Sequence, residues 1–476
     1  MRRAIARLCP PTGPGPLASR ARPARQRRGH GPRSAGAPPG DQRELMGQLR
    51  CARSSEELLA LVAHRAPAFN EIHCSAACVY LARLLLEDGA GPGLHDPRLL
   101  PLLVRVRELL PDFGTRALSN VLWAMSKWAQ ACPGWRPGDD LLQDWATISR
   151  RTLRDFNPQD LSNSLYAFAL LGHCPGREWM QDAVSVWEAR VSAFGPQNLS
   201  NSLWACATLA SRPPDALLRL TEKEVHRQLG GFKPQHLANS LWAYAKMSYT
   251  PSNALLQSMV QESRQKLGGF NPQNISNSLW AYTQLTFRPG QHFLQEVVGE
   301  SKRKIRGFTP NNLTNSLCAL VKQSCRLEGD FLRLLAGESQ RKLSHFNPQD
   351  LANSLWAYAT LDHHPGHRLL SSLEAECLRQ LPHFGPTELA NSLWACVTLG
   401  HMPAPEFLQE ISSESRRRIS SFKPQDLAVT AWACAGLGLL RGRVQSGSSS
   451  TLPESGGRPG GDRGRDSTGA EGPREE

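Results

Sequence analysis

The sequence lacks several features that would point to common classes of protein. No run of about 18 apolar residues occurs, so no membrane-spanning helix is predicted. The phosphate-binding pattern GxxxxGKS/T, the zinc-protease pattern HExxH and the nucleophile pattern GxSxG are also absent. These absences argue against the corresponding hydrolases, and we predict a protein with no intrinsic catalysis and no cofactor.

Paired cysteine motifs are missing as well. The twelve Cys residues are scattered without a CxxC pair, and several fall inside apolar helical runs. They are typical of small core residues in a reducing compartment and not of a disulfide framework. The segment HHPGH (His363, His364 and His367) contains metal-ligand side chains, but it occurs in one loop only, and we predict no metal site.

Acidic residues are absent from the first 40 positions, which contain nine Arg and are rich in Pro, Gly and Ala. This composition indicates an organellar transit peptide at residues 1–40, with the mitochondrion slightly favoured over the chloroplast. The alternative is a disordered basic arm that binds RNA. Residues 442–476 are Gly, Ser and charged residues, typical of a disordered tail. The net charge of +13 favours a polyanionic partner.

A landmark Phe recurs at a constant interval of 38 residues, seven times in succession. Numbered from this Phe, Pro stands at +2 in all eight copies, Leu or Ile at +5 and Ala at +11, which is helical spacing after an N-terminal Pro. Phe113 opens an earlier copy and Phe69 a more divergent one. The regular landmarks are Phe156, Phe194, Phe232, Phe270, Phe308, Phe346, Phe384 and Phe422.

Each copy contains a break such as HCPG or FRPG, followed by a second apolar-periodic segment. Each is therefore predicted to be a helix–turn–helix unit that cannot bury its apolar face alone. Stacked units give the predicted fold, an all-α solenoid of tandem 38-residue repeats with disordered termini. We assign residues 41–112 to a degenerate N-terminal helical cap and residues 113–441 to about nine repeats. The copy at Phe422 has no second helix before the tail.

The repeated pattern F-x-P-Q-x-L-S/A-N-S-L-W-A resembles the octotricopeptide repeat family and the related heptatricopeptide and Fas-activated-kinase-like repeat proteins. Copies include FGPQNLSNSLWACATL, FKPQHLANSLWAYAKM, FNPQNISNSLWAYTQL and FGPTELANSLWACVTL. The resemblance covers about residues 113–440. It implies a nucleus-encoded organellar factor that binds RNA and controls its maturation, stability or translation.

Two positions of the first helix are predicted to recognise RNA bases. The residues at +4 and +14 vary between copies, and their polar side chains offer distinct sets of donors and acceptors. The alternative for +4 is a structural role, because Asp and Asn are favoured in a first helical turn. The predicted base-reading residues are Asp160, Asn198, His236, Asn274, Asn312, Asp350, Glu388 and Asp426 at +4, and Lys246, Gln284 and Lys322 at +14.

Two nearly invariant positions are interpreted as structural. Asn recurs at +7, where we predict a ladder of amide bonds to a neighbouring unit's backbone; the alternative is a uniform contact to sugar or phosphate. Trp recurs at +10, where we predict packing between repeats; the alternative is base stacking. Aromatic residues at +12 (Tyr244, Tyr282 and Tyr358) are expected in the core.

The second helices end in basic clusters such as ESKRKI and ESRRRI. Some of these cations follow a Glu by four residues, which supports an exposed helical face. Others are predicted to have no such partner, and stacking of the units would align the cations into a stripe that follows phosphates. The candidates are Lys266, Lys304, Lys342 and Arg418, each four residues after a Glu, with Arg303, Arg341 and Arg417 beside them.

These observations together predict a binding protein for single-stranded RNA in an organelle, acting with the RNA-processing or translation machinery. Two alternatives remain open: a protein–protein interaction scaffold, since solenoids also bind peptides, and an accessory subunit of an RNA-processing or RNA-editing complex. The high positive charge favours RNA over a peptide.

Overall fold

The computed structural model describes residues 39–87, 96–132 and 134–446, with side chains as far as residue 438. These residues form helices, 3-10 turns and loops, with no strand among them, so the predicted all-α solenoid is confirmed. The predicted transit peptide and tail lie outside the described residues, apart from residues 39–40 and 442–446, which are helical. The chain divides into two compact units, residues 1–293 and 294–476.

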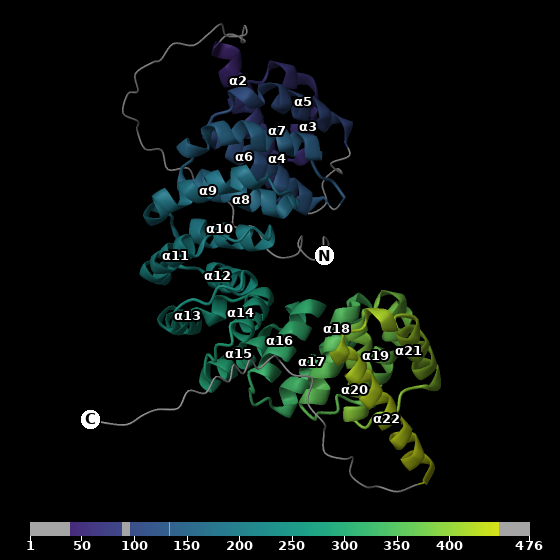
Figure 1. Cartoon of the computed structure of the whole chain (residues 1–476). Helices are drawn as coiled ribbons and strands as arrows, with labels where there is room; N and C mark the ends of the chain where they lie inside the picture. Colours follow the sequence, from purple (N-terminus) through teal and green to yellow (C-terminus); the bar gives the residue numbers. More distant parts are fainter. Residues whose placement is uncertain (1–38, 88–95, 133, 447–476) are drawn as a thin grey trace, which may run out of the picture. The chain divides into compact units, whose positions relative to one another are not determined.

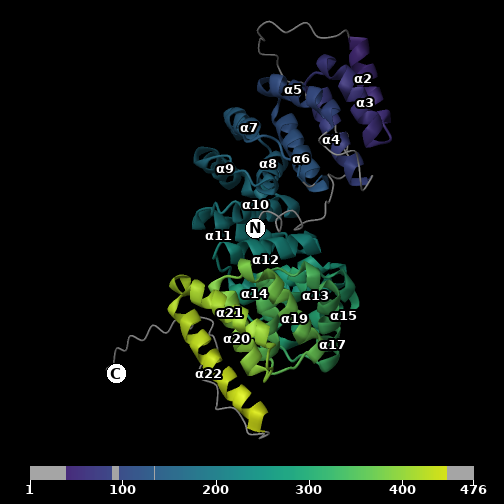
Figure 2. The ribbon, with the colours of Figure 1, turned by 90° about the vertical axis from the view of Figure 1, so that its right-hand side faces the viewer.

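Each repeat begins with a first helix that follows the landmark Phe. In the first unit these helices lie side by side in one layer (Figure 1). In the second unit α16, α18, α20 and α22 do the same (Figure 1). The second view shows α20 beside α22 as well (Figure 2). The first helices are α4 (Glu71–Glu87), α6 (Thr115–Ala131), α8 (Pro158–Leu171), α10 (Pro196–Thr208), α12 (Pro234–Lys246), α14 (Pro272–Gln284), α16 (Pro310–Lys322), α18 (Pro348–Thr360), α20 (Pro386–Thr398) and α22 (Pro424–Ser446).

The second helices run back beside the first helices and form the other layer of each unit. Most continue into a short 3-10 turn that leads to the next landmark Phe. They are α5 (Leu100–Leu109), α7 (Asp139–Thr152), α9 (Arg177–Arg190), α11 (Asp215–Arg227), α13 (Asn253–Gln265), α15 (Gln291–Lys304), α17 (Gly329–Lys342), α19 (His367–Gln380) and α21 (Pro405–Arg417).

The N-terminal region predicted as a degenerate helical cap contains several helices. Helices α2 (Pro39–Cys51) and α3 (Ser55–Arg65) precede the copy that starts at Phe69. Phe69 is fully buried, and the helix that follows it, α4, packs against α6, so the divergent copy folds as a helix pair. At the other end, α22 continues to Ser446 and passes the predicted repeat boundary at residue 441.

The landmark Phe fixes the start of each first helix. Phe346 has an extended backbone (φ −70°, ψ 138°), which ends the preceding 3-10 turn, and its ring is 2% exposed. Asn347 then caps the new helix, accepting the backbone N–H of Asp350 at 2.9 Å. Pro348 occupies the first helical position, where an N–H would have no helical partner. All the landmark Phe residues are between 0 and 9% exposed.

The core lies between the two layers and is formed as predicted. Tyr244, Tyr282 and Tyr358 are fully buried. Small residues at +6 and +11 are buried as well, for example Ala238 and Ala243 in α12, and they allow neighbouring first helices to approach closely. None of the described Cys residues forms a disulfide, and most are buried.

A hydrogen bond links the ends of six second helices to the landmark Phe of the repeat that they belong to. The donor stands four residues before the next Phe and reaches a carbonyl 34 residues back, as when Lys342 Nζ donates to the Phe308 carbonyl at 2.6 Å. We call this contact the repeat tie. Other ties join Arg190 to Phe156 (2.5 Å), Gln228 to Phe194 (2.7 Å), Lys266 to Phe232 (2.7 Å), Gln380 to Phe346 (2.7 Å) and Arg418 to Phe384 (2.5 Å).

We expect Lys342→Met to destabilise the second unit by about 2 kcal/mol, because it leaves two carbonyls without their Nζ donor and weakens the pairing of the buried Glu338. Lys342 Nζ also donates to the Arg306 carbonyl at 2.7 Å and lies 2.7 Å from Glu338. Urea unfolding followed by circular dichroism measures the change.

The matched control is Lys342→Arg, since Arg190 and Arg418 make the same tie in other repeats. We expect Lys342→Arg to stay within about 0.5 kcal/mol of the parent protein. Equal stability of the Met and Arg variants would show that the tie contributes nothing.

Candidate nucleic-acid interface

The residues at +4 point into the start of their own helix. They occupy the third helical position, and their side chains accept the backbone N–H of the capping residue at +1. Nδ1 of His236 accepts from Lys233 at 3.2 Å, Oδ1 of Asn274 from Asn271 at 3.2 Å, and Oδ2 of Asp350 from Asn347 at 3.4 Å. Equivalent bonds are made by Asn198, Asn312 and Asp426.

Several +4 side chains also contact the preceding repeat. Nδ2 of Asn198 donates to Ser162 Oγ at 2.9 Å, and Asp426 accepts from Thr387 Oγ1 at 3.5 Å.

This geometry favours the structural interpretation of +4 over base reading. Asp350 is 3% exposed and His236 is 6% exposed; Asp160, Asn274, Asn312 and Asp426 are also buried, while Asn198 and Glu388 are half-buried. A side chain that is buried and already accepts a hydrogen bond cannot contact a base without leaving its cap. At this point the repeats are linked by +4 side chains and by the repeat ties.

Burial shifts the pKa values of two +4 side chains in opposite directions. It raises the pKa of the Asp350 carboxyl to about 6, opposed by the backbone hydrogen bond from Asn347 and a side-chain bond from Asn311. It lowers the pKa of the His236 imidazole to about 4, helped by the nearby Lys233 and Lys266. Both groups are therefore less easily charged in the folded chain.

The predicted phosphate-binding cations are engaged within the fold. Lys266, Lys342 and Arg418 make the repeat ties, and their side chains are 27, 23 and 25% exposed. Lys304 pairs with Glu300 at 2.7 Å. These four residues lie where the repeats join, so most of their hydrogen-bonding capacity is directed into the protein.

The neighbouring arginines lack a Glu four residues earlier, as predicted, but they are paired by a different spacing. Each pairs with the same Glu three residues earlier: Arg303 Nε lies 2.8 Å from Glu300, Arg341 2.9 Å from Glu338, and Arg417 Nε 2.8 Å from Glu414. On a helix, a Glu three residues earlier is as close to an Arg as one four residues earlier, so the i,i+3 spacing also allows an ion pair. Their side chains remain 73, 59 and 65% exposed, so they still present charge to solvent.

Several carboxyl groups at the ends of the second helices have lowered pKa values. The Arg227 guanidinium lowers the pKa of Glu224, and Arg379 and Arg417 do the same for Glu376 and Glu414. A carboxyl with a lowered folded pKa stabilises the fold above its unfolded pKa, and this stability is lost as the pH falls through the folded value.

The outward face of the first-helix layer consists of positions +3, +7, +10 and +14, which share one side of the helix. Gln side chains predominate at +3, Asn at +7 and Trp at +10. The Asn side chains are mostly half-buried, and Nδ2 of Asn315 donates to Oδ1 of Asn311 at 3.0 Å in its own helix. At +14, Lys246, Gln284 and Lys322 are exposed. We call this surface the first-helix face.

Aromatic rings line the first-helix face from repeat to repeat. Tyr166 lies 5.0 Å from Trp204, Trp204 lies 6.4 Å from Trp242, and Trp242 lies 6.5 Å from Trp280, measured between ring centroids. Packing between repeats, predicted for +10, is therefore present. Trp242, Trp280, Trp356 and Trp432 are only half-buried, so part of each ring also faces solvent.

Cations lie over the same rings. Nζ of Lys322 is 5.5 Å from the centroid of the Trp356 ring, and Nζ of Lys127 is 5.3 Å from that of Tyr166. Such cation–π contacts hold positive charge beside the aromatic surface. A face that combines amides, aromatic rings and lysines has the groups that single-stranded nucleic acid binds.

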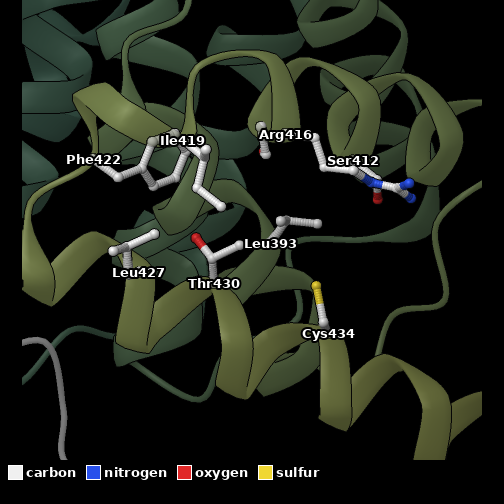
Figure 3. Close-up of a pocket in the computed structure, with 9 residues that line it drawn as sticks. Leu393, Ser412, Arg416, Ile419, Phe422, Leu427, Thr430 and Cys434 are labelled. Atoms are coloured by element: carbon white, nitrogen blue, oxygen red, sulfur yellow. The ribbon is translucent and has the colours of Figure 1, made fainter.

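A separate apolar pocket lies near the end of the described chain (Figure 3). It is formed by Leu393 of α20, Ser412 of α21, Ile419 and Phe422 of the following segment, and Leu427, Thr430 and Cys434 of α22. Ile419 is 57% exposed and Leu427 39% exposed. Their chemistry suits an apolar contact and not a nucleic acid.

Replacing His236 by Asn should remove one source of acid sensitivity. Between pH 6.5 and 4 the imidazole of His236 is protonated in the unfolded chain but not in the folded chain. The free energy of unfolding therefore decreases as the pH falls, by about 3 kcal/mol at most. Asn198, Asn274 and Asn312 fill this position elsewhere and make the same cap. The difference in unfolding free energy between His236→Asn and the parent chain should grow in favour of Asn below pH 6.5; a constant difference contradicts the assignment.

Replacing Asp350 by Asn should have the opposite pH dependence. The raised folded pKa of Asp350 contributes stability below its ordinary value of 3.8, and this contribution is lost as the pH rises through about 6. At pH 7.5 the parent chain holds a buried charge, so Asp350→Asn, which keeps the capping oxygen, should be more stable by about 2 kcal/mol. The gain should shrink below pH 4. A variant that is less stable at pH 7.5 would show that the ionised carboxylate is needed.

No helix in the described part of the chain is long and apolar enough to cross a membrane.

Comparison with curated proteins finds no match. A family model described as a protein of unknown function (DUF1601) matches residues 48–71 and 143–165. A second family model, described as the N-terminal domain of the Tbc2 translation factor, matches residues 180–331 and 325–448. The two segments matched by the Tbc2 model together cover more than half of the chain, and they coincide with the regular repeats. The chain belongs to this Tbc2 N-terminal domain family, a translation-related family of helical-repeat proteins.

Proposed function

We propose that the protein binds single-stranded RNA along the first-helix face and, in an organelle, controls the processing, stability or translation of its transcript without catalysing a reaction itself. The observation that carries the proposal is the set of half-buried Trp rings at +10 in four repeats (Trp242, Trp280, Trp356 and Trp432), with exposed polar side chains such as Lys246 and Gln284 beside them. The translation-related family supports it.

Four of the repeats offer a stacking surface for a base. Trp242, Trp280 and Trp356 expose part of the indole, and base–aromatic stacking contributes about 1–3 kcal/mol per base. Stacking alone does not discriminate strongly between bases, because every base has a π-face. The aromatic series therefore accounts for affinity.

Sequence selectivity would come from the exposed side chains at +14. Lys246, Gln284 and Lys322 differ in their donors and acceptors. Lys246 and Gln284 lie one turn of helix from Trp242 and Trp280, and Lys322 lies over the ring of Trp356 in the next repeat. Selectivity is accordingly assigned to +14 and not to the capped residues at +4. The lysines also contribute charge that attracts phosphate.

Arg303, Arg341 and Arg417 provide a second positively charged surface at the opposite end of the helix pair. A strand following these arginines would lie along the edge where second helices end and would not reach the aromatic series. RNA binding on the first-helix face and RNA binding along the arginines can be told apart by removing the same number of charges from each surface.

The alternative function is protein–protein interaction, and the apolar pocket near α22 favours it (Figure 3). A partner with an apolar segment could cover Ile419 and Leu427. Such an interaction is compatible with RNA binding, as an RNA-bound factor recruits processing or translation machinery through a surface distinct from its RNA site.

RNA affinity of the full chain, measured against salt with a random-sequence single strand, tests the proposal. We expect a steep negative slope of log affinity against log salt, reduced by about 1.4 in Lys246→Gln/Lys322→Gln, because two phosphate contacts are lost. Trp242→Leu/Trp280→Leu should weaken binding at least tenfold at every salt concentration while leaving the slope unchanged.

The matched control is Arg303→Gln/Arg341→Gln, which removes the same charge from the other surface and should change the slope by much less. A larger effect of the arginine pair would place the RNA on the second-helix ends. Absence of salt-dependent binding in the parent chain would exclude the RNA function and leave the protein-interaction alternative.

A further inference from the structure

Three histidines from two consecutive repeats of the second unit come together. His364 lies in the loop after α18, His367 begins α19, and His401 lies in the loop after α20. One ring nitrogen from each lies within 4.8 Å of the other two, and the ring centroids of His364 and His367 are 4.6 Å apart. The HHPGH segment supplies only two of the three; the third is 34 residues further along the chain than His367.

A buried carboxylate orients the third imidazole. Glu374 of α19 is 7% exposed and bonds to Nε2 of His401, while its other oxygen accepts the backbone N–H of Ala404 at 3.4 Å. Because Nε2 is held in this way, Nδ1 is the nitrogen of His401 that remains for another ligand. A carboxylate bonded to the far nitrogen of an imidazole is the arrangement found behind metal-bound histidines.

A hydrogen bond in the loop also involves the ring of His364. Nδ1 of His364 accepts the backbone N–H of Gly366 at 3.1 Å, so the proton of the neutral ring is on Nε2. An ion bound through Nδ1 would replace this hydrogen bond.

We infer that His364, His367 and His401 form a binding site for a divalent transition-metal ion of the Zn²⁺ class, with Glu374 as the residue that positions His401. Zn²⁺ takes imidazole nitrogens at about 2.0–2.1 Å, so the three nitrogens must close in slightly from their present separation. His364 and His367 are exposed and can rotate to do so. The fourth coordination position faces solvent and would hold water.

The consequence for the fold is a metal link between two repeats. The ion would join the turn of the Phe346 repeat to the turn of the Phe384 repeat, at the end of the helix pairs opposite to the repeat ties. The inference rests on the histidines and Glu374 alone and does not depend on RNA binding.

Titration of the metal-stripped full chain with Zn²⁺ by calorimetry, and with Co²⁺ by visible absorption, tests the inference. We expect one ion per chain, ligand-field bands typical of nitrogen coordination, and a higher thermal unfolding midpoint with Zn²⁺. His364→Ala/His367→Ala should abolish all three effects without unfolding the chain, because both side chains are exposed. Glu374→Gln should retain the site but weaken Zn²⁺ binding about tenfold or more.

His345→Ala/His383→Ala is the control, since it removes two exposed imidazoles of the same unit that lie outside the cluster. It should bind Zn²⁺ as the parent chain does. The inference is overturned if the cluster variant binds Zn²⁺ as tightly as this control, or if the parent chain takes up no Co²⁺ with the expected absorption.

Discussion

The repeat tie is the contact on which the rest of the architecture depends. Its donor stands four residues before one landmark Phe and its acceptor is the carbonyl of the preceding one, 34 residues back. The two intervals add up to the 38-residue period of the sequence. The extended backbone of the Phe leaves its carbonyl outside any helix and therefore in need of a donor. Arg, Lys and Gln all meet this need, so the donor varies in charge while the geometry stays constant.

The fold could be predicted because its determinants recur at fixed positions. The buried Phe, the Pro at the first helical position and the aromatic core residues such as Tyr244 each appear once per repeat, so agreement between copies identified them. The N-terminal helix pair at Phe69 was recognised less fully, since its copy has lost the Asn and Trp. What periodicity could not supply is the direction of a side chain. Asp350 at +4 varies like a residue that reads sequence, yet it varies only among groups that can cap a helix.

The candidate site could be predicted only in part, because periodicity identifies repeated residues but not the directions of their side chains. The Trp series was identified, and both roles considered for it, packing and stacking, involve the same ring. The helix-end cations were seen as a row of charge, but a helical wheel does not show that Lys342 reaches back to the Phe308 carbonyl. The sequence does not reveal His401 as a member of the histidine cluster. It lies in the turn of the next repeat, about one repeat length from His364 and His367, and a local motif contains only neighbours in sequence.

The tie also brings a carboxylate into several joints. Glu224, Glu376 and Glu414 occupy one position of the repeat, beside the donors Gln228, Gln380 and Arg418, and each has a lowered pKa. Repeat arrays usually lose structure from their ends, where neighbours are fewest. Joints that share a carboxyl with a lowered pKa are weakened together by acidification, so acid would act on internal joints as well as on the ends.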